Sequence, residues 1–387
     1  MTGKRLTLAV CAAAIALTGL AAGAPTAGAR SFSPEVQRKL ALATRNNMTE
    51  ARLPGAVVGV WVPGRGSYVR AFGIANRATG RPARITDHVR IASNTKTFAA
   101  TAILQLVDDG RLSLDDHLSQ YVPGVPNGDV ITIRQLLHMT AGVYDFTDDD
   151  AFGQAFYANP RMSFTEADFF AILGRHAPEF APGSAISYSD SNYWLLGMVL
   201  EKVTGRPISG VIRDQILRPL GLKNTSYPTG QTLPKPFARG YFGGLEFNDP
   251  LTDKTLVNPA VGGAAGAMQS TLGDLRKWVK ALATGRLLSP SLQAQRLQFQ
   301  SFGIPGPVDL SYGLGIFKLG NLIGHNGAVI GYSSAMLYLP SNGATLVVWG
   351  NNSTNSSTPA TTIAFDLAEI LFPKAVDEGE PYGPTGS

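Results

Sequence analysis

The hydrophobic pattern near the start of the chain changes from helical to strand-like. A helical pattern over residues 33–47 is followed by two apolar runs, at 55–62 and 67–72, with a Pro- and Gly-containing segment at 63–66 between them. Short apolar runs around such a turn are typical of a β-hairpin. The pattern therefore predicts a helix followed by two antiparallel strands.

The middle of the chain, from about residue 93 to residue 288, is mostly helical in pattern, with loops marked by Pro and Gly. Apolar residues recur on one face of the segment 95–109, which ends at Gly110. The segments 192–203 and 274–283 have the same character, and a Gly follows each of them closely. Apolar positions at helical spacing that stop near a Gly predict helices.

Strand patterns return near the end of the chain. Apolar runs occupy residues 312–317, 333–339 and 344–349, and a helical run follows at about 360–371. Strands at both ends of a chain with helices between them predict an α+β fold, with one antiparallel sheet built from both termini. We expect the terminal helices to flank this sheet. The inserted helical region at about 93–288 should face the sheet across a cleft, a favoured place for a site.

Composition excludes several classes of protein. Of the 387 residues, 44% are hydrophobic and only 16% are charged, which is unlike a disordered chain. The formal net charge is +5, but Lys and Arg form no dense run, so a nucleic acid is not an expected partner. Cys11 is the single cysteine, and the five histidines lack metal-binding spacing. We expect no disulfide, no metal and no other cofactor.

The first residues have the order of a secretory signal peptide. Lys4 and Arg5 precede an uncharged, Ala-rich run to about residue 24, and the small residues up to Ala29 follow it. We predict Sec-type export with cleavage after Ala29, leaving a domain at 30–373 and a flexible tail at 374–387. The alternative is a membrane anchor, which the weak hydrophobicity of the run disfavours. The mature protein is therefore expected to be secreted, without a membrane span.

Ser93 and Lys96 form the central chemical motif. They lie three residues apart at the start of a predicted helix, so the lysine can reach the serine hydroxyl. A serine hydroxyl is a weak nucleophile that needs a nearby base, and a helix N-terminus directs N–H groups toward developing negative charge. By itself an S-x-x-K match is common, so the motif alone also fits an ordinary helix start.

Two further segments follow in order. Tyr188, Asp190 and Asn192 precede or begin an apolar helix, and His325 and Gly327 lie in a Gly-flanked strand. The three segments resemble the S-x-x-K, Y-x-N and K/H-x-G motifs of the penicillin-recognising serine hydrolases. That group includes class C β-lactamases, D-alanyl-D-alanine carboxypeptidases and related esterases and D-amino-acid peptidases. The resemblance covers about residues 54–351 and implies the β-lactamase/transpeptidase-like fold.

The resemblance implies a role for each matching residue. Ser93 would attack a carbonyl group and form an acyl-enzyme, while Lys96 and Tyr188 share the proton. Tyr188 would be the base for the deacylating water, and His325 would assist proton transfer or orient the substrate. The backbone N–H groups of Ser93 and Ala328 would form the oxyanion hole, in which one donor contributes about 3 kcal/mol.

Asp190 departs from the family pattern, which has an asparagine at this position. An amide both donates and accepts hydrogen bonds, whereas a carboxylate only accepts them. Asp190 can therefore hold Lys96 and raise the pKa of that lysine, but it cannot donate to a substrate amide carbonyl. This disfavours efficient β-lactam hydrolysis and leaves esters and simpler amides as substrates. Asn192 is a candidate for the missing donor.

The third segment also differs from the family pattern. Asn326 stands where the carboxypeptidases often have threonine, and Phe317 and Lys318 occupy the strand position where a basic residue would bind a C-terminal D-Ala carboxylate. Neighbouring residues on a strand point to opposite faces, so only one of the two can face the cleft. Phe317 there would favour an esterase, and Lys318 would favour a carboxypeptidase.

Three functions remain from the sequence. The leading one is an exported D-alanyl-D-alanine carboxypeptidase or D-amino-acid peptidase that acts on peptidoglycan-type peptides. The second is an esterase or weak β-lactamase on the same fold, and the third is a binding module without catalysis. The expected substrate-contacting residues are Asp190, Asn192, Asn326, Gly327, Ala328, Lys318 and Tyr144. Phe146 and Tyr241 are further candidates for the acyl pocket.

Overall fold

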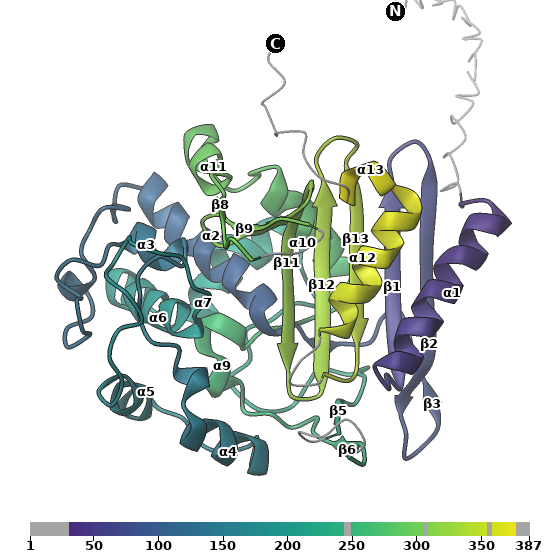
Figure 1. Cartoon of the computed structure of the whole chain (residues 1–387), viewed down its shortest axis with the longest axis horizontal. Helices are drawn as coiled ribbons and strands as arrows, with labels where there is room; N and C mark the ends of the chain where they lie inside the picture. The colour runs from purple at the N-terminus through teal and green to yellow at the C-terminus, as the bar shows by residue number, and fades with distance from the viewer. Residues whose placement is uncertain (1–30, 244–248, 305–307, 354–357, 377–387) are drawn as a thin grey trace, which may run out of the picture.

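The computed structural model describes residues 31–243, 249–304, 308–353 and 358–376. A nine-stranded antiparallel sheet forms the centre of the fold (Figure 1). Its strands lie in the order β3-β2-β1-β13-β12-β11-β10-β9-β8. The first part of the chain supplies β1 (Gly55–Val62), β2 (Gly66–Asn76) and β3 (Arg81–Pro82). The last part supplies β8 (Gln300–Ser301), β9 (Leu310–Tyr312), β10 (Phe317–Leu319), β11 (Leu322–Val329), β12 (Tyr332–Leu339) and β13 (Ala344–Gly350). Pairing of β1 with β13 confirms the predicted sheet built from both ends of the chain.

Helices cover both faces of this sheet. The first and last long helices, α1 (Pro34–Glu50) and α12 (Pro359–Leu371), pack against each other, and α12 lies on β12 and β13 (Figure 1). On the opposite face α10 (Leu272–Ala283) packs against β11, β12 and β13, although it falls within the range 93–288 expected to face the sheet across a cleft. Because both faces are covered, β12 and β13 are buried along their whole length.

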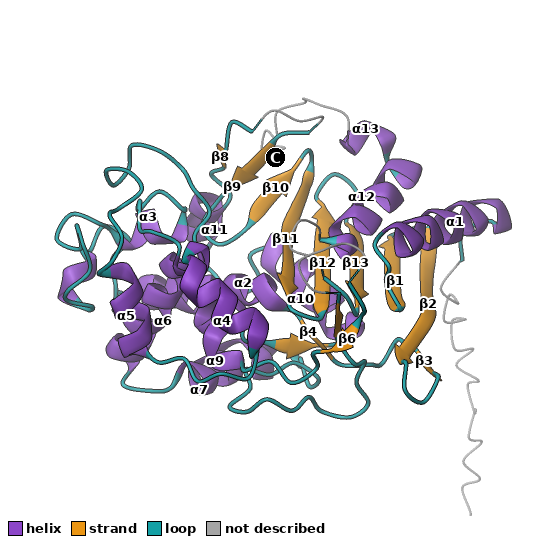
Figure 2. Ribbon diagram, turned by 60° about the horizontal axis from the view of Figure 1, so that its bottom comes forward, coloured by secondary structure: helices purple, strands orange, loops and turns teal. Residues whose placement is uncertain are grey.

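The helical region lies beside the sheet (Figure 2). At its centre α2 (Thr95–Asp108) contacts α6 (Asp190–Thr204) and α9 (Pro259–Gly266). Neighbours surround α2, so its buried residues lie on all sides of the helix and not along one stripe. The other helices are α3 (Ile133–Leu137), α4 (Asp150–Ala158), α5 (Glu166–Leu173), α7 (Ile208–Ile212), α8 (Arg218–Leu220) and α11 (Pro290–Arg296). Two short strand pairs join β4 (Val89–Arg90) to β7 (Gln269–Ser270) and β5 (Tyr241–Phe242) to β6 (Thr252–Asp253).

The predicted single strand at 312–317 is wrong. It is divided into the end of β9 and the start of β10, which pair with each other as a hairpin. Gly315 in the connection has a φ of 76°, and a Cβ added to it would lie 2.1 Å from the Ala100 side chain on α2. The glycine therefore allows a tight turn directly against the central helix, which the apolar run in the sequence conceals.

The two ends of the chain extend beyond the described residues. A short helix, α13 (Pro373–Val376), includes the first three residues of the predicted tail at 374–387. The rest of that tail and the predicted leader at 1–29 lie outside the described residues. Among the residues that are described, none of the helices combines the length and the apolar character needed to cross a bilayer.

Candidate active site

Ser93 lies where the helical region meets the sheet. It is the middle residue of a short 3-10 helix (Ala92–Asn94) that leads directly into α2. Ala92 has a φ of 46°, in the left-handed region that residues with a side chain rarely adopt. Strand β11 approaches so closely that a Cβ added to Gly327 would lie 2.7 Å from the Ser93 nitrogen. Such backbone strain is concentrated at functional sites, so the local geometry marks Ser93 independently of its motif.

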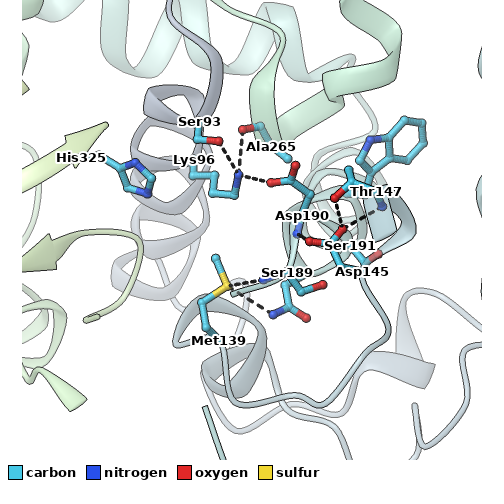
Figure 3. Close-up of polar contacts among 12 residues, drawn as sticks. Ser93, Lys96, Met139, Asp145, Thr147, Ser189, Asp190, Ser191, Ala265 and His325 are labelled. Carbon is cyan, nitrogen blue, oxygen red and sulfur yellow. Dashed lines mark hydrogen bonds and ion pairs between the residues drawn. The ribbon is translucent and has the colours of Figure 1, made fainter. Parts of the chain in front are cut away.

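Lys96 links Ser93 to the helical region. Its Nζ donates to Ser93 Oγ at 3.1 Å, to the Ala265 carbonyl oxygen at 3.1 Å and to Asp190 Oδ1 (Figure 3). These three bonds hold the buried ammonium group in place. Burial favours the neutral amine, but attraction and hydrogen bonds from Asp190 and Tyr188 outweigh it and raise the pKa of Lys96 to about 12. In the resting site Lys96 is therefore an ammonium ion and not a free base.

Tyr188 lies two residues before α6, with its ring centroid 4.8 Å from Lys96 Nζ. Its hydroxyl end is buried, although 38% of the surface of the whole residue is exposed. Burial raises the pKa of Tyr188, and the charge of Lys96 and hydrogen bonds with Lys96 and Ser93 reduce this rise. The resting site thus pairs an ammonium ion with a neutral phenol. A catalytic base forms only when one of the two loses its proton.

Asp145 is a second carboxylate behind Asp190 that the sequence analysis missed. Its Oδ2 accepts from the Asp190 backbone N–H at 2.9 Å, and its Oδ1 accepts from the Thr147 backbone N–H at 3.0 Å. Asp145 thereby caps the start of α6, where Ser189 makes no capping bond with its side chain. Burial and repulsion by Asp190 raise the pKa of Asp145 to about 7, against the effect of these hydrogen bonds.

Asp145 is expected to make stability depend on pH. Folding raises the pKa of its carboxyl from 3.8 to about 7, so the folded state binds this proton more tightly than the unfolded chain does. The stabilisation of the folded state by this proton is complete below pH 3.8 and is lost as the pH rises through 7. With Asp145→Asn, the free energy of unfolding relative to the wild type should rise by up to about 1.4 kcal/mol per pH unit over that interval. Urea unfolding at several pH values measures this difference, and a constant difference would contradict the assignment.

His325 lies in β11 and is fully buried. Its Nδ1 is 2.6 Å from the Asn326 carbonyl oxygen, which can only accept, so Nδ1 carries the proton. The Tyr312 hydroxyl, 3.0 Å from Nε2, must then donate to that nitrogen. Burial and the positive charge of Lys96 lower the pKa of His325 to about 3. Tyr312 and the Asn326 carbonyl thus occupy both ring nitrogens, and the neutral ring can position its neighbours without transferring a proton.

A cavity of about 260 Å³ opens beside Ser93. Asp190 and Ala328 also lie on its wall. Two rings that are one turn apart on α4, Phe152 and Phe156, stack on each other. The apolar lining residues include Phe146, Phe152, Phe156, Tyr157, Val257, Val261, Val329 and Ile330. A substrate whose carbonyl carbon lies at Ser93 Oγ can therefore place an apolar group against α4.

Two of the predicted substrate-contacting residues are turned away from this cavity. Asn192 is buried, and its Nδ2 donates to Met139 Sδ at 3.4 Å, so it cannot replace the donor that Asp190 lacks. The side chain of Asn326 donates to Thr361 Oγ1 on α12 at 3.0 Å.

The strand position of the predicted carboxylate clamp is occupied by an aromatic ring. The ring centroid of Phe317 is 5.0 Å from that of His325, so Phe317 lies on the side of the site. Lys318 is its neighbour on β10 and has the opposite orientation, where its charge acts on Asp309.

Of the three aromatic residues predicted near the acyl pocket, one lines the cavity and two do not. Tyr144 stacks on His176 with a ring-centroid distance of 3.9 Å, and the Tyr241 hydroxyl accepts from the Arg77 N–H at 2.7 Å. Neither of them lines the cavity, whereas Phe146 does. The sequence did not predict Phe152 and Phe156 as pocket residues, although their spacing of four residues places them side by side on a helix.

The model of the Beta-lactamase family matches residues 40–369, which is most of the chain. The chain belongs to the beta-lactamase family. Its structure is similar to the crystal structure of a D-stereospecific amidohydrolase from a Streptomyces species. The identity is 32% and the TM-score 0.76, and the match covers 86% of this chain and 98% of the other.

Two other relatives extend the comparison. The D-amino acid amidase from Ochrobactrum anthropi SV3, complexed with L-phenylalanine amide, matches at 26% identity and a TM-score of 0.76, over 88% of this chain and 98% of that one. Protein flp of Staphylococcus aureus (strain MW2) is 31% identical over 323 residues, or 81% of this chain and 63% of that protein. The chain thus spans less than two thirds of the length of that relative.

Proposed function

We propose that this beta-lactamase-family protein is a serine hydrolase that cleaves the amide bond following a D-amino acid residue. The observation that carries the proposal is the Lys96 Nζ bound to Ser93 Oγ at 3.1 Å beside a largely apolar cavity. Similarity to a D-stereospecific amidohydrolase and a D-amino acid amidase supports the stereochemistry. The same acyl-enzyme would form from esters, so esterase activity on the same acyl group is the second candidate function.

The reaction would proceed in two steps. Once the Lys96–Tyr188 pair has given up one proton to solvent, Ser93 Oγ attacks the carbonyl carbon and passes its own proton to this pair. The oxyanion accepts from the N–H groups of Ser93 and Ala328. The amine leaves with the transferred proton, which breaks the carbon–nitrogen bond and leaves an ester on Ser93. Water then attacks this ester, giving up a proton to the same pair, and the pair returns it to Ser93 Oγ as the acid leaves.

Within this proposal, a peptidase or amidase is favoured over a carboxypeptidase. A carboxypeptidase must bind a free C-terminal carboxylate, and Phe317 rather than Lys318 lies beside His325. An aromatic ring supplies no charge for a carboxylate, whose desolvation would then be uncompensated.

A pair of matched substrates is the direct test. We expect D-alanyl-D-alanine amide to be hydrolysed with a kcat/KM at least about 10-fold above that of the dipeptide with a free carboxylate, which corresponds to 1.4 kcal/mol. Chromatography of the products measures both rates, and the L,L-dipeptide amide controls for stereochemistry. Preference for the free carboxylate would contradict the assignment of Phe317, and preference for the L form would contradict the proposed function.

Export belongs to the same proposal. Lys4 and Arg5, the uncharged run after them and the small residues before Arg30 support secretion of the mature domain. A secreted hydrolase would meet peptidoglycan-type peptides outside the cell.

A further inference from the structure

Asp190 has one carboxylate oxygen in the Lys96 ion pair, and its second oxygen is available to a ligand. Within the described residues, Lys96 Nζ is the single hydrogen-bond donor to this carboxylate. The side chain keeps 28% of its surface exposed and lines the same cavity as Ser93. The site therefore presents an acceptor with a formal negative charge beside the nucleophile.

The distances fit the α-nitrogen of a substrate. Lys96 Nζ bonds both Ser93 Oγ and Asp190 Oδ1, so these oxygens are at most two hydrogen-bond lengths apart. In an aminoacyl-enzyme the α-nitrogen is three bonds from Ser93 Oγ, or about 3 Å, given single-bond lengths near 1.5 Å. A hydrogen bond of about 2.9 Å then reaches the carboxylate of Asp190.

The chemistry of a carboxylate selects among possible α-substituents. A carboxylate only accepts hydrogen bonds, so an ammonium group satisfies it, whereas the carbonyl oxygen of an N-acyl group is repelled. An asparagine at the same position could donate to that carbonyl. Asp190 therefore favours a free amine over an acylated one.

Two further carboxyl groups lie near Asp190. Asp145 accepts from its backbone N–H, and the pKa of Asp148 is raised by burial, by Glu179 and, to a smaller extent, by Asp190. Lys96 is the cation that Asp190 bonds directly.

Two other basic side chains have partners of their own among the described residues. Arg175 forms an ion pair with Asp149, and Arg90, on the cavity wall, donates to the backbone oxygens of Gln231 and Thr255. A substrate ammonium would thus reduce the repulsion between Asp190 and Asp145.

A bound ammonium group also has a mechanistic effect. Lys96 is an ammonium ion in the resting site because Asp190 and Tyr188 raise its pKa. A second cation at Asp190 competes for this attraction and repels the charge on Nζ, which lowers the pKa of Lys96. The substrate itself would increase the fraction of Lys96 that can accept the Ser93 proton.

We propose that Asp190 is a specificity-determining residue that binds the free α-ammonium group of the substrate, so that the enzyme acts on unblocked aminoacyl amides and esters. This inference rests on the proposed function and names the substrate class of the same site. N-acylated peptides and penicillins with an acylamido side chain are accordingly poor substrates.

The experiment compares D-phenylalanine amide with N-acetyl-D-phenylalanine amide in the wild type and in Asp190→Asn. We expect the wild type to prefer the free amine by at least about 10-fold in kcat/KM, and the variant to lose or reverse this preference, in line with 1.4 kcal/mol for each factor of ten. The ratio is the readout, because weaker positioning of Lys96 would slow both substrates alike. Asp148→Asn is the matched control and should keep the wild-type ratio within about threefold, since Asp148 makes no bond to Lys96.

Two results would overturn the inference. One is a wild type that does not prefer the free amine, and the other is an Asp190→Asn variant with an unchanged ratio. The p-nitrophenyl esters of the same two acyl groups distinguish failure of this inference from failure of the proposed function. If no amide is hydrolysed, amidase function is rejected, and the ester ratio still tests whether Asp190 selects the amine.

Discussion

Replacement of Ser93 by alanine is expected to remove both acyl-enzyme formation and turnover. The attacking oxygen is lost, while the oxyanion donors, the cavity and the Lys96–Asp190 ion pair remain. Loss of a catalytic serine nucleophile lowers kcat by roughly 10⁴- to 10⁶-fold, and binding and the oxyanion hole account for the residual rate. Assay of D-phenylalanine amide hydrolysis, together with the intact mass after incubation with an activated D-aminoacyl ester, measures both effects.

The control for this variant is its fold. Ser93 is half-buried and its side chain bonds to Lys96, so Ser93→Ala should leave the thermal unfolding temperature within a few degrees of the wild-type value. An adduct that still forms on the variant, or turnover at the wild-type rate, would reject Ser93 as the nucleophile. Absence of turnover in the wild type as well, with no adduct, would reject catalysis altogether and leave the binding-module alternative.

Replacement of Lys96 by methionine is expected to have the second largest effect. Methionine has a similar length but can neither accept the Ser93 proton nor balance the charge of Asp190, which would oppose the developing oxyanion. Loss of general-base assistance lowers the rate by roughly 10²- to 10⁴-fold. We expect the loss to appear in kcat and in the pre-steady-state acylation rate measured with an activated ester.

The double variant Lys96→Met/Asp190→Asn separates catalysis from stability. Lys96→Met leaves the Asp190 carboxylate without its cation, which destabilises the fold, although the 28% exposure of that side chain moderates the effect. Asp190→Asn removes the unpaired charge, so the double variant should recover thermal stability without recovering activity. A Lys96→Met enzyme that acylates at the wild-type rate would exclude Lys96 as the base, and recovery of activity with stability would show that Lys96 has only a structural role.

The sequence predicted the architecture because the relevant signals are local. Apolar runs at 55–62, 333–339 and 344–349 lie in strands whose bounds differ by one residue or less, since a buried strand is nearly continuous in hydrophobicity. The same logic failed at 312–317, where an apolar run contains the glycine turn between β9 and β10. Periodicity alone does not distinguish one strand from a hairpin of two short ones.

The site was likewise predictable where its contacts are local in the sequence and not where they depend on packing. Ser93 and Lys96 are one helical turn apart, so their spacing determined their contact. Asp145 could not be found in this way, because it lies in an acidic segment that resembles a solvated loop. Only packing against the start of α6 shows that its carboxylate is buried and bonded to the Asp190 N–H.

The sequence by itself thus predicted Ser93 as the nucleophile, Lys96 beside it, the order of the three motifs and a sheet built from both ends of the chain. The Ser93–Lys96 contact follows from residue spacing, the motifs and the role of Ser93 from the family resemblance, and the sheet from apolar runs at the two ends of the chain. Only the tertiary structure decided that His325 is neutral with both nitrogens engaged, that Phe317 and not Lys318 lies beside it, and that Asp190 presents a free acceptor to the cavity. These properties depend on burial and on contacts between segments far apart in the chain, where the cost of desolvation determines which charges persist.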